Sequence, residues 1–479
     1  MDALPRPFPS LLIRADGLEG HGSFAENQQR YFDPDSATLA ELDELLKRRN
    51  AGIVAHFYMD AELQGVLCHA TSPHVHISDS LQMSDRAVAM ADAGIGTIVV
   101  LGVDFMAENV RAMLDASGHS RVAVYRVAAT PIGCSLAESA EGPAYRAYLE
   151  KAASRGHALH VVYINTSLQT KAWAHQVVPT ITCTSSNVVG TVLSAFAHDP
   201  ELELWFGPDT YMGRNLHTLF GRVSAMSEAR VAEIHGAHTP ESVARLVRHF
   251  HYFEQGTCIV HEMFGARVVD RVKSDYSDAH VVAHLEVPGE MFALGLEAQL
   301  AGRGVVGSTS DILGYIGKEV ARSLRSSERS NPTFVLGTES GMITSIVEAV
   351  RALLRRADDP DATAEIVFPV SDDAIVPTGD PGLPLVPGVA QTEGCSVSGG
   401  CATCPYMKMN SLDALIDLLR REGVAQLDAF RPRQYSERIA GRSLAEVGSQ
   451  PILHMRAFQD SGRLPEALMC RVASLPKRD

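Results

Sequence analysis

The sequence predicts an α/β protein built from three related three-layer αβα domains with parallel sheets, arranged around a pseudo-threefold axis with a site at their junction. Two observations lead to this fold class. Short apolar runs that resemble buried strands alternate with longer stretches of helical spacing, which is the pattern of parallel α/β sheets. Four local features also recur three times in the same order along the chain, which indicates an internal repeat.

The first feature is an apolar strand that ends in polar residues. The three stretches are "AGIVAHFYMD" with His56 and Tyr58, "LHVVYINTS" with Tyr163 and Asn165, and "AHVVAHLEV" with His284 and Glu286. Parallel α/β folds bind their ligands at the carboxyl ends of the strands. We therefore expect these six side chains to face a pocket.

The second feature is a small, hydroxyl-rich turn after each of these strands. The turns are "ISDSL", "CTSSN" and "GSTSD", and they contain Ser80, Ser185 and Thr309. Each turn is placed where a strand gives way to a helix, and a helix N-terminus favours carboxylate or phosphate. For any one turn alone, simple N-capping by Ser, Thr or Asp explains the residues. Three such turns around one centre would suit a small molecule with several negative charges.

The third and fourth features are a strand that closes on glycine and an acid, and a cysteine farther along. The acids are Asp104, Asp209 and Glu339, and the cysteines are Cys134, Cys258 and Cys404. If the three domains meet around one axis, one thiol from each repeat reaches the same point.

The stretch "GCATCPYMKMN" contains Cys401 and Cys404, and Cys395 lies upstream. These thiols fit a redox couple, a zinc site, or one part of a site whose other ligands lie far away. A structural zinc site usually takes four ligands in two close pairs, and only Cys401 and Cys404 form such a pair. Three cysteines from three domains fit a [4Fe–4S] cluster better, because it would keep one open iron for Lewis-acid chemistry.

The chain has 479 residues, of which 46% are hydrophobic, so it is long enough for several domains with a large core. The expected organisation is an N-terminal extension (1–37), three α/β domains (38–140, 141–265 and 266–410), and a C-terminal helical segment (411–479) that packs back on the core. The domains carry Cys134, Cys258 and Cys404 in that order.

The charge and the apolar pattern exclude several classes of partner. The net charge of −15 argues against non-specific nucleic-acid binding, and no apolar run reaches membrane-spanning length. The start of the chain lacks the pattern of a secretory signal, so we expect a cytoplasmic protein. Eight cysteines are too few for a disulfide scaffold and are expected to be buried thiols, metal ligands or catalytic groups.

Nine motifs resemble, in order, those of the quinolinate synthase family. They are "IVAHFY", "SDSL", "VVYINTS" followed by Lys171, "TSSN", "FGPDTYMGRN", "CIVHEMF", "GSTS", "GTESGM" and "CPYMKMN", from about Ile53 to Leu419. The resemblance implies a [4Fe–4S] cluster with one non-cysteine site. It also implies condensation of iminoaspartate with dihydroxyacetone phosphate to quinolinate, with loss of phosphate and two waters, for NAD synthesis.

The same resemblance implies a set of site residues. The expected catalytic residues are Glu286, Tyr58, Tyr163 and His261. The expected substrate-binding residues are His56, Ser80, Tyr163, Asn165, Ser185, His284, Glu286 and Thr309. The expected cluster ligands are Cys134, Cys258 and Cys404, with Cys395 and Cys401 as neighbours that form a disulfide in some family members.

The chain departs from the family pattern at three places. The stretch "HQVVPTITCTSSN" looks extended, so the match of Ser185 rests on "TSSN" itself. Leu285 stands where the family usually has proline, and proline restricts the backbone, so the direction of Glu286 could differ. The segment before the first hydroxyl turn looks extended and adds Cys68, His69, His74 and His76. A surface or lid insertion and a second metal site are the two interpretations of that segment.

The expected partners are the two small-molecule substrates and an aspartate oxidase that supplies iminoaspartate, with no nucleic acid and no membrane. The expected assembly is a monomer or a homodimer. Two alternatives remain at this point. One is another three-cysteine [4Fe–4S] enzyme with three domains, such as the diphthamide-synthesis radical enzymes or hydroxymethylbutenyl diphosphate reductase. The other is a non-catalytic iron–sulfur or zinc sensor.

Overall fold

The computed structural model describes residues 8–261, 264–326, 331–357, 359–369 and 404–475. The chain divides into two compact units. Unit 1 comprises Met1–Val103, His119–Ile132 and Ile259–Arg431, and unit 2 comprises Asp104–Gly118, Gly133–Cys258 and Pro432–Asp479. Cys395 and Cys401, with the disulfide that the resemblance raised for them, lie outside the described residues.

Unit 1 contains two parallel sheets of the same topology. The first has the strand order β4-β3-β5-β6, with β3 (Ala51–His56), β4 (Val75–Ser78), β5 (Thr97–Leu101) and β6 (Ala123–Arg126). The parallel part of the second has the order β12-β11-β13-β14, with β11 (His280–His284), β12 (Gly304–Gly307), β13 (Thr333–Gly337) and β14 (Ala364–Val367). In both sheets the first strand in sequence pairs with the second on one side and the third on the other.

Unit 2 repeats this strand order a third time. Its sheet has the order β8-β7-β9-β10, with β7 (Ala158–Tyr163), β8 (Thr180–Cys183), β9 (Glu203–Gly207) and β10 (Phe250–Tyr252). Every residue of β3 and of β7 is buried, as expected for strands covered on both faces. Three parallel sheets with one strand order confirm the α/β prediction, whereas the pseudo-threefold arrangement and the domain boundaries stay predictions.

The N-terminal segment contributes two strands to unit 1. Strand β1 (Ser10–Ile13) pairs antiparallel with β14, and β2 (Leu18–His21) pairs antiparallel with β1. They extend the second sheet of unit 1 to six strands. Antiparallel strands often form the edge of an otherwise parallel sheet.

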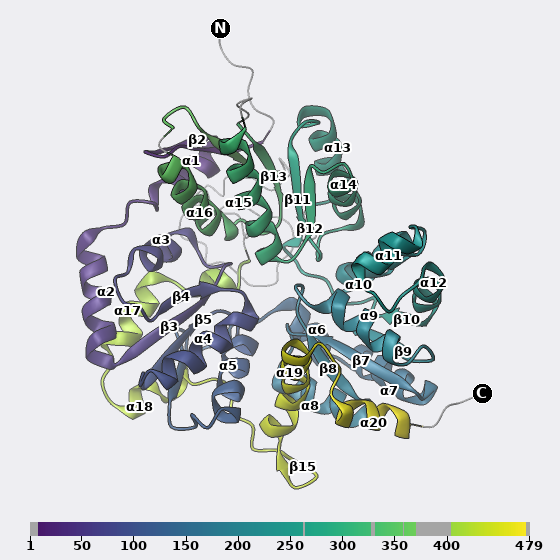
Figure 1. The fold of residues 1–479 in the computed structure, drawn as a ribbon. Coiled ribbons are helices and arrows are strands. Elements are labelled where there is room, and N and C mark those ends of the chain that lie inside the picture. The colour runs from purple at the N-terminus through teal and green to yellow at the C-terminus, as the bar shows by residue number, and fades with distance from the viewer. Residues whose placement is uncertain (1–7, 262–263, 327–330, 358, 370–403, 476–479) are drawn as a thin grey trace. The chain divides into compact units, whose positions relative to one another are not determined.

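Helices cover the sheets of both units. In unit 1 they are α1 (Ser23–Arg30), α2 (Ser36–Arg49), α3 (Ala61–His69), α4 (Ser80–Asp92), α13 (Ala266–Asp275), α14 (Gly289–Leu300), α15 (Thr309–Arg325), α16 (Met342–Ala357), α17 (Leu412–Arg420) and α18 (Val424–Leu427). In unit 2 they are α5 (Asp104–Ala116), α6 (Ser135–Glu141), α7 (Pro143–Arg155), α8 (Leu168–Val177), α9 (Val188–His198), α10 (Thr210–Ser224), α11 (Glu228–Ile234), α12 (Pro240–His249), α19 (Leu444–Ser461) and α20 (Glu466–Ser474). Figure 1 shows the layers most clearly around β11 and β13, where α13 and α14 lie on one side and α15 and α16 on the other.

Short polar side chains start the helices that follow the strands. Asp79 accepts hydrogen bonds from the backbone N–H groups of Leu81 and Gln82 at the start of α4. Ser308 and Asp311 form a capping box at the start of α15. Such caps satisfy backbone donors that have no partner within the helix. They therefore fix the turns that lead from the strand ends into the helices.

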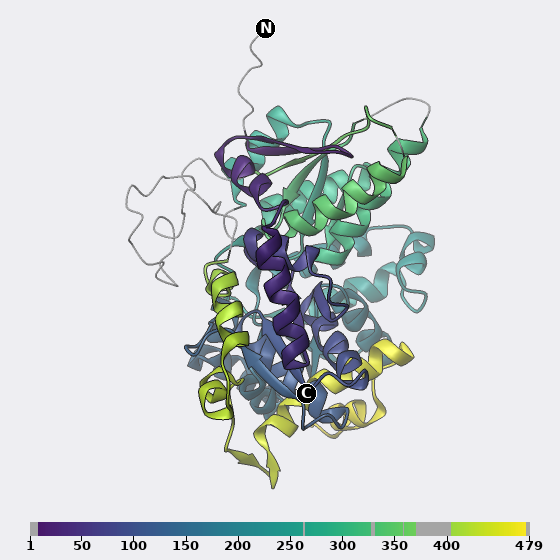
Figure 2. The same ribbon diagram turned by 90° about the vertical axis from the view of Figure 1, so that its left-hand side faces the viewer.

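The C-terminal part of the chain packs on both units. Helix α17 lies against α2 in unit 1, and Figure 2 shows the two helices running side by side. In unit 2, α19 packs against α8 and β8. Gly448 permits this contact, because a Cβ atom there would lie 2.3 Å from the carbonyl oxygen of Leu168.

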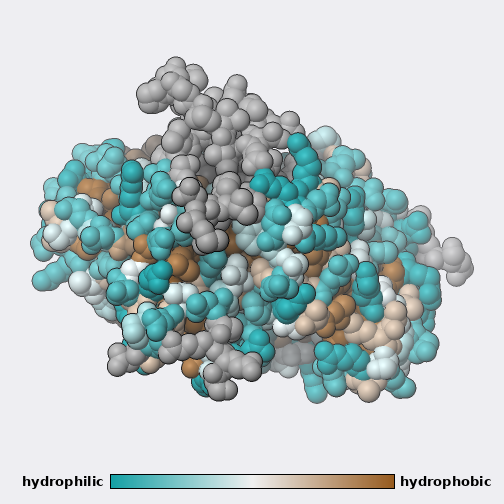
Figure 3. Space-filling model, turned by 90° about the horizontal axis from the view of Figure 1, so that it is seen from above, coloured by the Kyte–Doolittle hydropathy of each residue, from teal (hydrophilic) through white to brown (hydrophobic). Residues whose placement is uncertain are grey.

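The surface of the described chain is mainly polar. Figure 3 shows one face on which hydrophilic side chains surround small, scattered apolar areas. The large hydrophobic side chains that are exposed are Ile234 and Leu300. None of the described helices combines the length and the apolar character that a membrane crossing requires.

Candidate active site

The strand ends and the hydroxyl-rich turns meet in the same way in all three sheets. The register pairs His56 with Ser78, Tyr163 with Cys183, and His284 with Gly307. Two residues after each of these partners the chain reaches Ser80, Ser185 and Thr309. Each polar strand end therefore has a hydroxyl side chain beside it at the carboxyl edge of its sheet. Ser80 and Thr309 are the first residues of α4 and α15, and Ser185 lies in the turn before α9.

Two histidines of unit 1 use the same local geometry at these edges. The Nδ1 atom of His56 accepts a hydrogen bond from the backbone N–H of Tyr58 at 3.2 Å. The Nδ1 atom of His284 accepts one from the backbone N–H of Glu286 at 3.3 Å. An Nδ1 atom that accepts leaves the proton on Nε2. Both imidazoles therefore present an Nε2–H donor.

Burial keeps these two imidazoles neutral. It lowers the pKa of His56 to about 4, against the attraction of Glu286. Burial also lowers the pKa of His284 to about 4, again with Glu286 opposing the shift. Desolvation disfavours the charged form of a base. At neutral pH these histidines are hydrogen-bond donors without a net charge.

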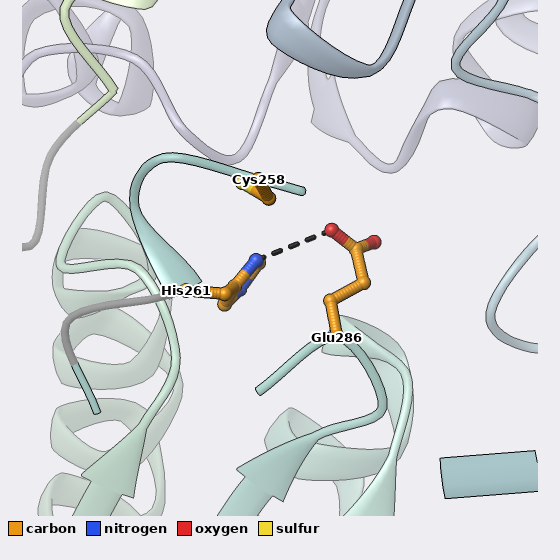
Figure 4. Close-up of side chains that lie close together, drawn as sticks. All are labelled: Cys258, His261 and Glu286. Atoms are coloured by element: carbon orange, nitrogen blue, oxygen red, sulfur yellow. Dashed lines mark ion pairs between the residues drawn. The ribbon is translucent and has the colours of Figure 1, made fainter. Parts of the chain in front are cut away.

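His261 and Glu286 form the centre of the site. The Nδ1 atom of His261 lies 3.2 Å from Oε2 of Glu286, and the exposed fractions of the two residues are 1% and 4%. Figure 4 shows Glu286 directed toward the His261 ring. The other oxygen of Glu286 lies 3.7 Å from Nδ1 of His284. One buried carboxylate thus faces two imidazoles.

Leu285 does not turn Glu286 away from the site. Its side chain is buried, and its backbone N–H donates to the carbonyl oxygen of Gly307 at 3.1 Å. Proline has no N–H and could not make this bond. The leucine therefore continues the β11–β12 hydrogen bonding by one residue, and Glu286 faces His261.

Tyr58 borders the same cluster. Its ring lies with its centroid 4.6 Å from that of His56 and 6.4 Å from that of His261, and its hydroxyl lies 3.4 Å from Oγ1 of Thr338. The backbone of Gly341 packs directly against the backbone of Tyr58. A Cβ atom on Gly341 would lie 2.5 Å from Cα of Tyr58.

Glu339 contacts the segment of one predicted cluster ligand, and sequence reasoning did not find this contact. Its Oε1 accepts a hydrogen bond from the backbone N–H of Cys404 at 2.7 Å. Burial raises the pKa of Glu339 well above its usual value, and the hydrogen bond from Cys404 opposes the rise. The recurring strand that closes on glycine and an acid marked this position. The contact with Cys404 could not be read from that pattern, because 65 residues separate the two.

Unit 2 contains the remaining predicted substrate residues. Tyr163 is buried at the end of β7, and Asn165 and Ser185 are half-buried. Asn187 fixes the turn of Ser185, since its Oδ1 accepts from the backbone N–H of Thr184 at 2.8 Å. The roles predicted for Tyr163, Asn165 and Ser185 stay predictions.

Unit 2 also brings the segments of two predicted cluster ligands together. The hydroxyl of Ser135, next to Cys134, donates to the carbonyl oxygen of Thr257, next to Cys258, at 3.0 Å. The hydroxyl of Ser139 makes a second such bond to Gln255 at 2.9 Å. Cys134 and Cys258 are half-buried, as is Cys404 in unit 1, whereas Cys183 is buried.

Two residues of unit 1 offer a nitrogen and an oxygen at the spacing of metal ligands. A ring nitrogen of His261 and a carboxylate oxygen of Glu286 lie within 4.8 Å of each other. The Nε2 atom of His261 is buried and has no hydrogen-bond partner among the described residues. Buried polar atoms are usually paired, so this donor set fits a metal or a polar ligand.

Among the residues that the structure describes, Cys68, His69, His74 and His76 do not come together as a metal-binding group. Cys68 and His69 end α3, and His76 belongs to β4. The Nδ1 atom of His69 lies 2.8 Å from the carbonyl oxygen of Gly65 in its own helix. The extended segment therefore forms regular structure around the first sheet.

Comparison with known proteins identifies one family. A family model described as "Quinolinate synthetase A protein" matches residues 40–357. The chain is 52% identical to a chloroplastic quinolinate synthase of Nicotiana tabacum over 97% of its length and 66% of the relative. It is 51% identical to the chloroplastic enzyme of Arabidopsis thaliana, over 98% of its length and 67% of the relative. A quinolinate synthase of Thermosynechococcus vestitus is 28% identical over 80% of the chain and 86% of the relative.

These relatives are named as enzymes, and the chain spans about two thirds of the length of the plant relatives. The predicted cytoplasmic location is wrong, because the relatives that are 49–52% identical are named chloroplastic. The prediction relied on the lack of a secretory signal and of a membrane-length apolar run. Neither feature distinguishes the cytoplasm from a plastid, since transit peptides are not long apolar segments.

Proposed function

This chain belongs to the quinolinate synthetase A family, and we propose that it is a quinolinate synthase of NAD biosynthesis. The reaction condenses iminoaspartate with dihydroxyacetone phosphate and releases quinolinate, phosphate and two waters. The family match supports this proposal most strongly, because residues 40–357 include every predicted site residue except Cys404. The alignments with two plant relatives cover 97% and 98% of this chain, and they support extending the proposal to the rest of the chain.

Unit 1 is suited to binding the negative groups of the substrates. Iminoaspartate carries two carboxylates, and dihydroxyacetone phosphate carries a phosphate. The neutral Nε2–H groups of His56 and His284 can donate to such oxygens. Ser80 and Thr309, the first residues of α4 and α15, add hydroxyl donors at the positive ends of the helix dipoles. A link between the two helix starts, from the Ser310 hydroxyl to Asp79 at 3.1 Å, holds them together.

Glu286 is the residue best placed to move protons. Formation of the pyridine ring requires removal of protons from carbon and delivery of protons to two departing hydroxyls. A carboxylate 3.2 Å from an imidazole nitrogen can accept a proton at Oε2 and pass it to His261. Tyr58 in unit 1 and Tyr163 in unit 2 are the further acid–base candidates, with hydroxyls that can donate or accept.

The chain's thiols suit the cofactor that this reaction requires. Cys134, Cys258 and Cys404 would hold a [4Fe–4S] cluster, which supplies one open iron that polarises a substrate oxygen. The half-buried state of these thiols and the hydrogen bond that joins the Cys134 and Cys258 segments support this assignment. The buried Nε2 of His261 gives the site a further polar atom for a ligand.

The proposal is tested by a quinolinate assay on anaerobically reconstituted protein. Iminoaspartate is generated in the assay, and each substrate is omitted in turn. We expect about four iron and four sulfide per chain and quinolinate only when both substrates are present. Full iron loading without quinolinate formation would favour the non-catalytic sensor. Zinc in place of iron would contradict the cluster.

Other parts of the prediction remain proposals. A three-cysteine enzyme of another family fits less well than a quinolinate synthase, because the family match covers the first sheet of unit 1, the sheet of unit 2, and strands β11, β12 and β13. An aspartate oxidase remains the proposed source of iminoaspartate. A monomer or a homodimer remains the expected assembly.

A further inference from the structure

The ammonium group of Lys171 lies inside the loop that follows β7. Lys171 belongs to α8, and its side chain is 0% exposed. Its Nζ atom donates to the carbonyl oxygen of Ile164 at 3.1 Å and also to the carbonyl oxygen of Thr166. These two carbonyls flank Asn165 on either side. Lys171 therefore contacts the backbone at the point where Asn165 leaves it.

The rest of this loop is hydrogen-bonded as well. The hydroxyl of Thr166 donates to the carbonyl oxygen of Tyr163 at 3.0 Å, and the backbone N–H of Thr166 donates to Ile164 at 2.7 Å. The backbone N–H of Ile164 donates to Cys183 on β8 at 2.9 Å. Among the residues from Tyr163 to Thr166, only Asn165 is half-buried, and the others are buried. The loop is thus a fixed support that leaves Asn165 accessible.

A second buried charge accompanies Lys171. Glu108 on α5 accepts hydrogen bonds from the backbone N–H of Leu168 at 2.8 Å and from the hydroxyl of Tyr435 at 2.9 Å. Burial lowers the pKa of Lys171 to about 7, and the charge of Glu108 opposes that shift. Glu108 therefore stabilises the start of α8 and the charge of Lys171 together.

A buried lysine is costly if its only task is to fill space. Removing an ammonium group from water costs free energy that its partners only partly compensate. An apolar residue of similar volume often stabilises a fold as well or better. Methionine has almost the same length and would fill the position without that cost. What methionine cannot do is donate to the carbonyls of Ile164 and Thr166. The hydrogen bonds to the loop are therefore the feature that distinguishes lysine here.

We propose that Lys171 is a positioning residue of the substrate site, and that its ammonium group holds the loop that presents Tyr163 and Asn165. The proposal rests on the proposed function, because those two residues are expected to bind substrate. Lys171 itself is buried behind the loop and acts through it. Loss of its donors would let the loop relax and move both side chains.

The test is Lys171→Met in the full chain after anaerobic reconstitution. A misplacement of about 1 Å costs about a hundredfold in rate, so we expect kcat to fall by roughly that factor. We expect the dissociation constant of quinolinate, measured by titration calorimetry, to rise about tenfold, with iron content unchanged. The control is Lys151→Met, which changes an exposed lysine on α7 of the same unit and should leave both constants unchanged.

A second variant separates positioning from folding. Lys171→Met combined with Glu108→Gln removes both buried charges, and its thermal unfolding reports whether unit 2 stays folded. Weakened quinolinate binding in a folded variant supports the proposal. A smaller active fraction with an unchanged dissociation constant would mean that Lys171 is purely structural, and this would overturn the proposal. Failure of both variants to fold would overturn it as well. Wild-type protein that makes no quinolinate would overturn the proposed function, whereas active wild type with unaltered variants would overturn only this inference.

Discussion

His261 and His284 lie face to face, with ring centroids 5.1 Å apart and ring planes 9° from parallel. Glu286 lies beside both rings, at 3.2 Å from one and 3.7 Å from the other. His284 stays neutral because burial lowers its pKa to about 4, and His261 adds to that effect. The carboxylate therefore lies beside one imidazole that is neutral and a second imidazole whose Nδ1 atom is 3.2 Å from Oε2.

Glu286→Gln tests this assignment. Glutamine keeps the shape and the hydrogen-bonding atoms but does not take up a proton. We expect turnover to fall on the order of a hundredfold or more, the usual size for a lost acid–base group, while iron content and quinolinate binding are retained. Glu290→Gln, at an exposed glutamate on α14, is the matched control. Near-normal turnover of the Glu286 variant would assign the proton transfer to another residue.

Substitution of the three predicted ligands tests the cluster. Cys134→Ala, Cys258→Ala and Cys404→Ala should each abolish iron binding and activity, because a three-thiolate cluster has no spare ligand. Cys470→Ala, at an exposed thiol, should leave iron, sulfide and activity unchanged. Iron retained in any of the first three variants would remove that cysteine from the ligand set.

Gly341→Ala tests the close approach behind Tyr58. The added Cβ would lie 2.5 Å from Cα of Tyr58, so one of the two backbones must move. We expect a stability loss of about 1–3 kcal/mol and a lower kcat from the displaced tyrosine. The control is Gly314→Ala on α15, where nothing lies within 4 Å of the new atom and alanine favours the helix by about 0.5–1 kcal/mol. A wild-type kcat in Gly341→Ala would show that the position of Tyr58 does not matter.

The neutral state of His56 predicts a pH dependence of stability. Burial lowers its pKa from 6.5 to about 4, so between these values the unfolded chain binds a proton that the folded chain does not. The free energy of unfolding therefore keeps its full value with respect to His56 above pH 6.5 and decreases as the pH falls toward 4. The decrease is about 3 kcal/mol. Urea unfolding of the cluster-free protein should show this loss, and His56→Asn should reduce it. If the free energy of unfolding changed equally with pH in both proteins, the pKa of His56 would be the same in the folded and the unfolded chain.

The parts of the site that form near the ends of strands could be predicted from the sequence. An apolar run that ends in His, Tyr or Glu places those side chains at a sheet edge, so His56, Tyr163 and His284 were found from local pattern. His261 follows β10 in a loop without such a pattern, and only the family resemblance selected it. Its contact with Glu286 depends on how two distant segments fold together.

Long-range contacts explain what sequence reasoning missed. Glu339 meets Cys404 across 65 residues, and β1 joins the sheet at β14, far away in the chain. The burial of Lys171 could not be predicted for a different reason. A lysine at a helical position reads as solvent-exposed, and only the folded loop shows that it is enclosed.

The proposed condensation is most directly tested by following the carbon atoms of one substrate. Reconstituted protein is incubated without oxygen with iminoaspartate and uniformly carbon-13-labelled dihydroxyacetone phosphate, and the product is analysed by mass spectrometry. We expect quinolinate that carries all the carbons of the labelled phosphate ester, with one phosphate released for each quinolinate formed. Protein with a complete cluster that releases no labelled quinolinate would contradict it.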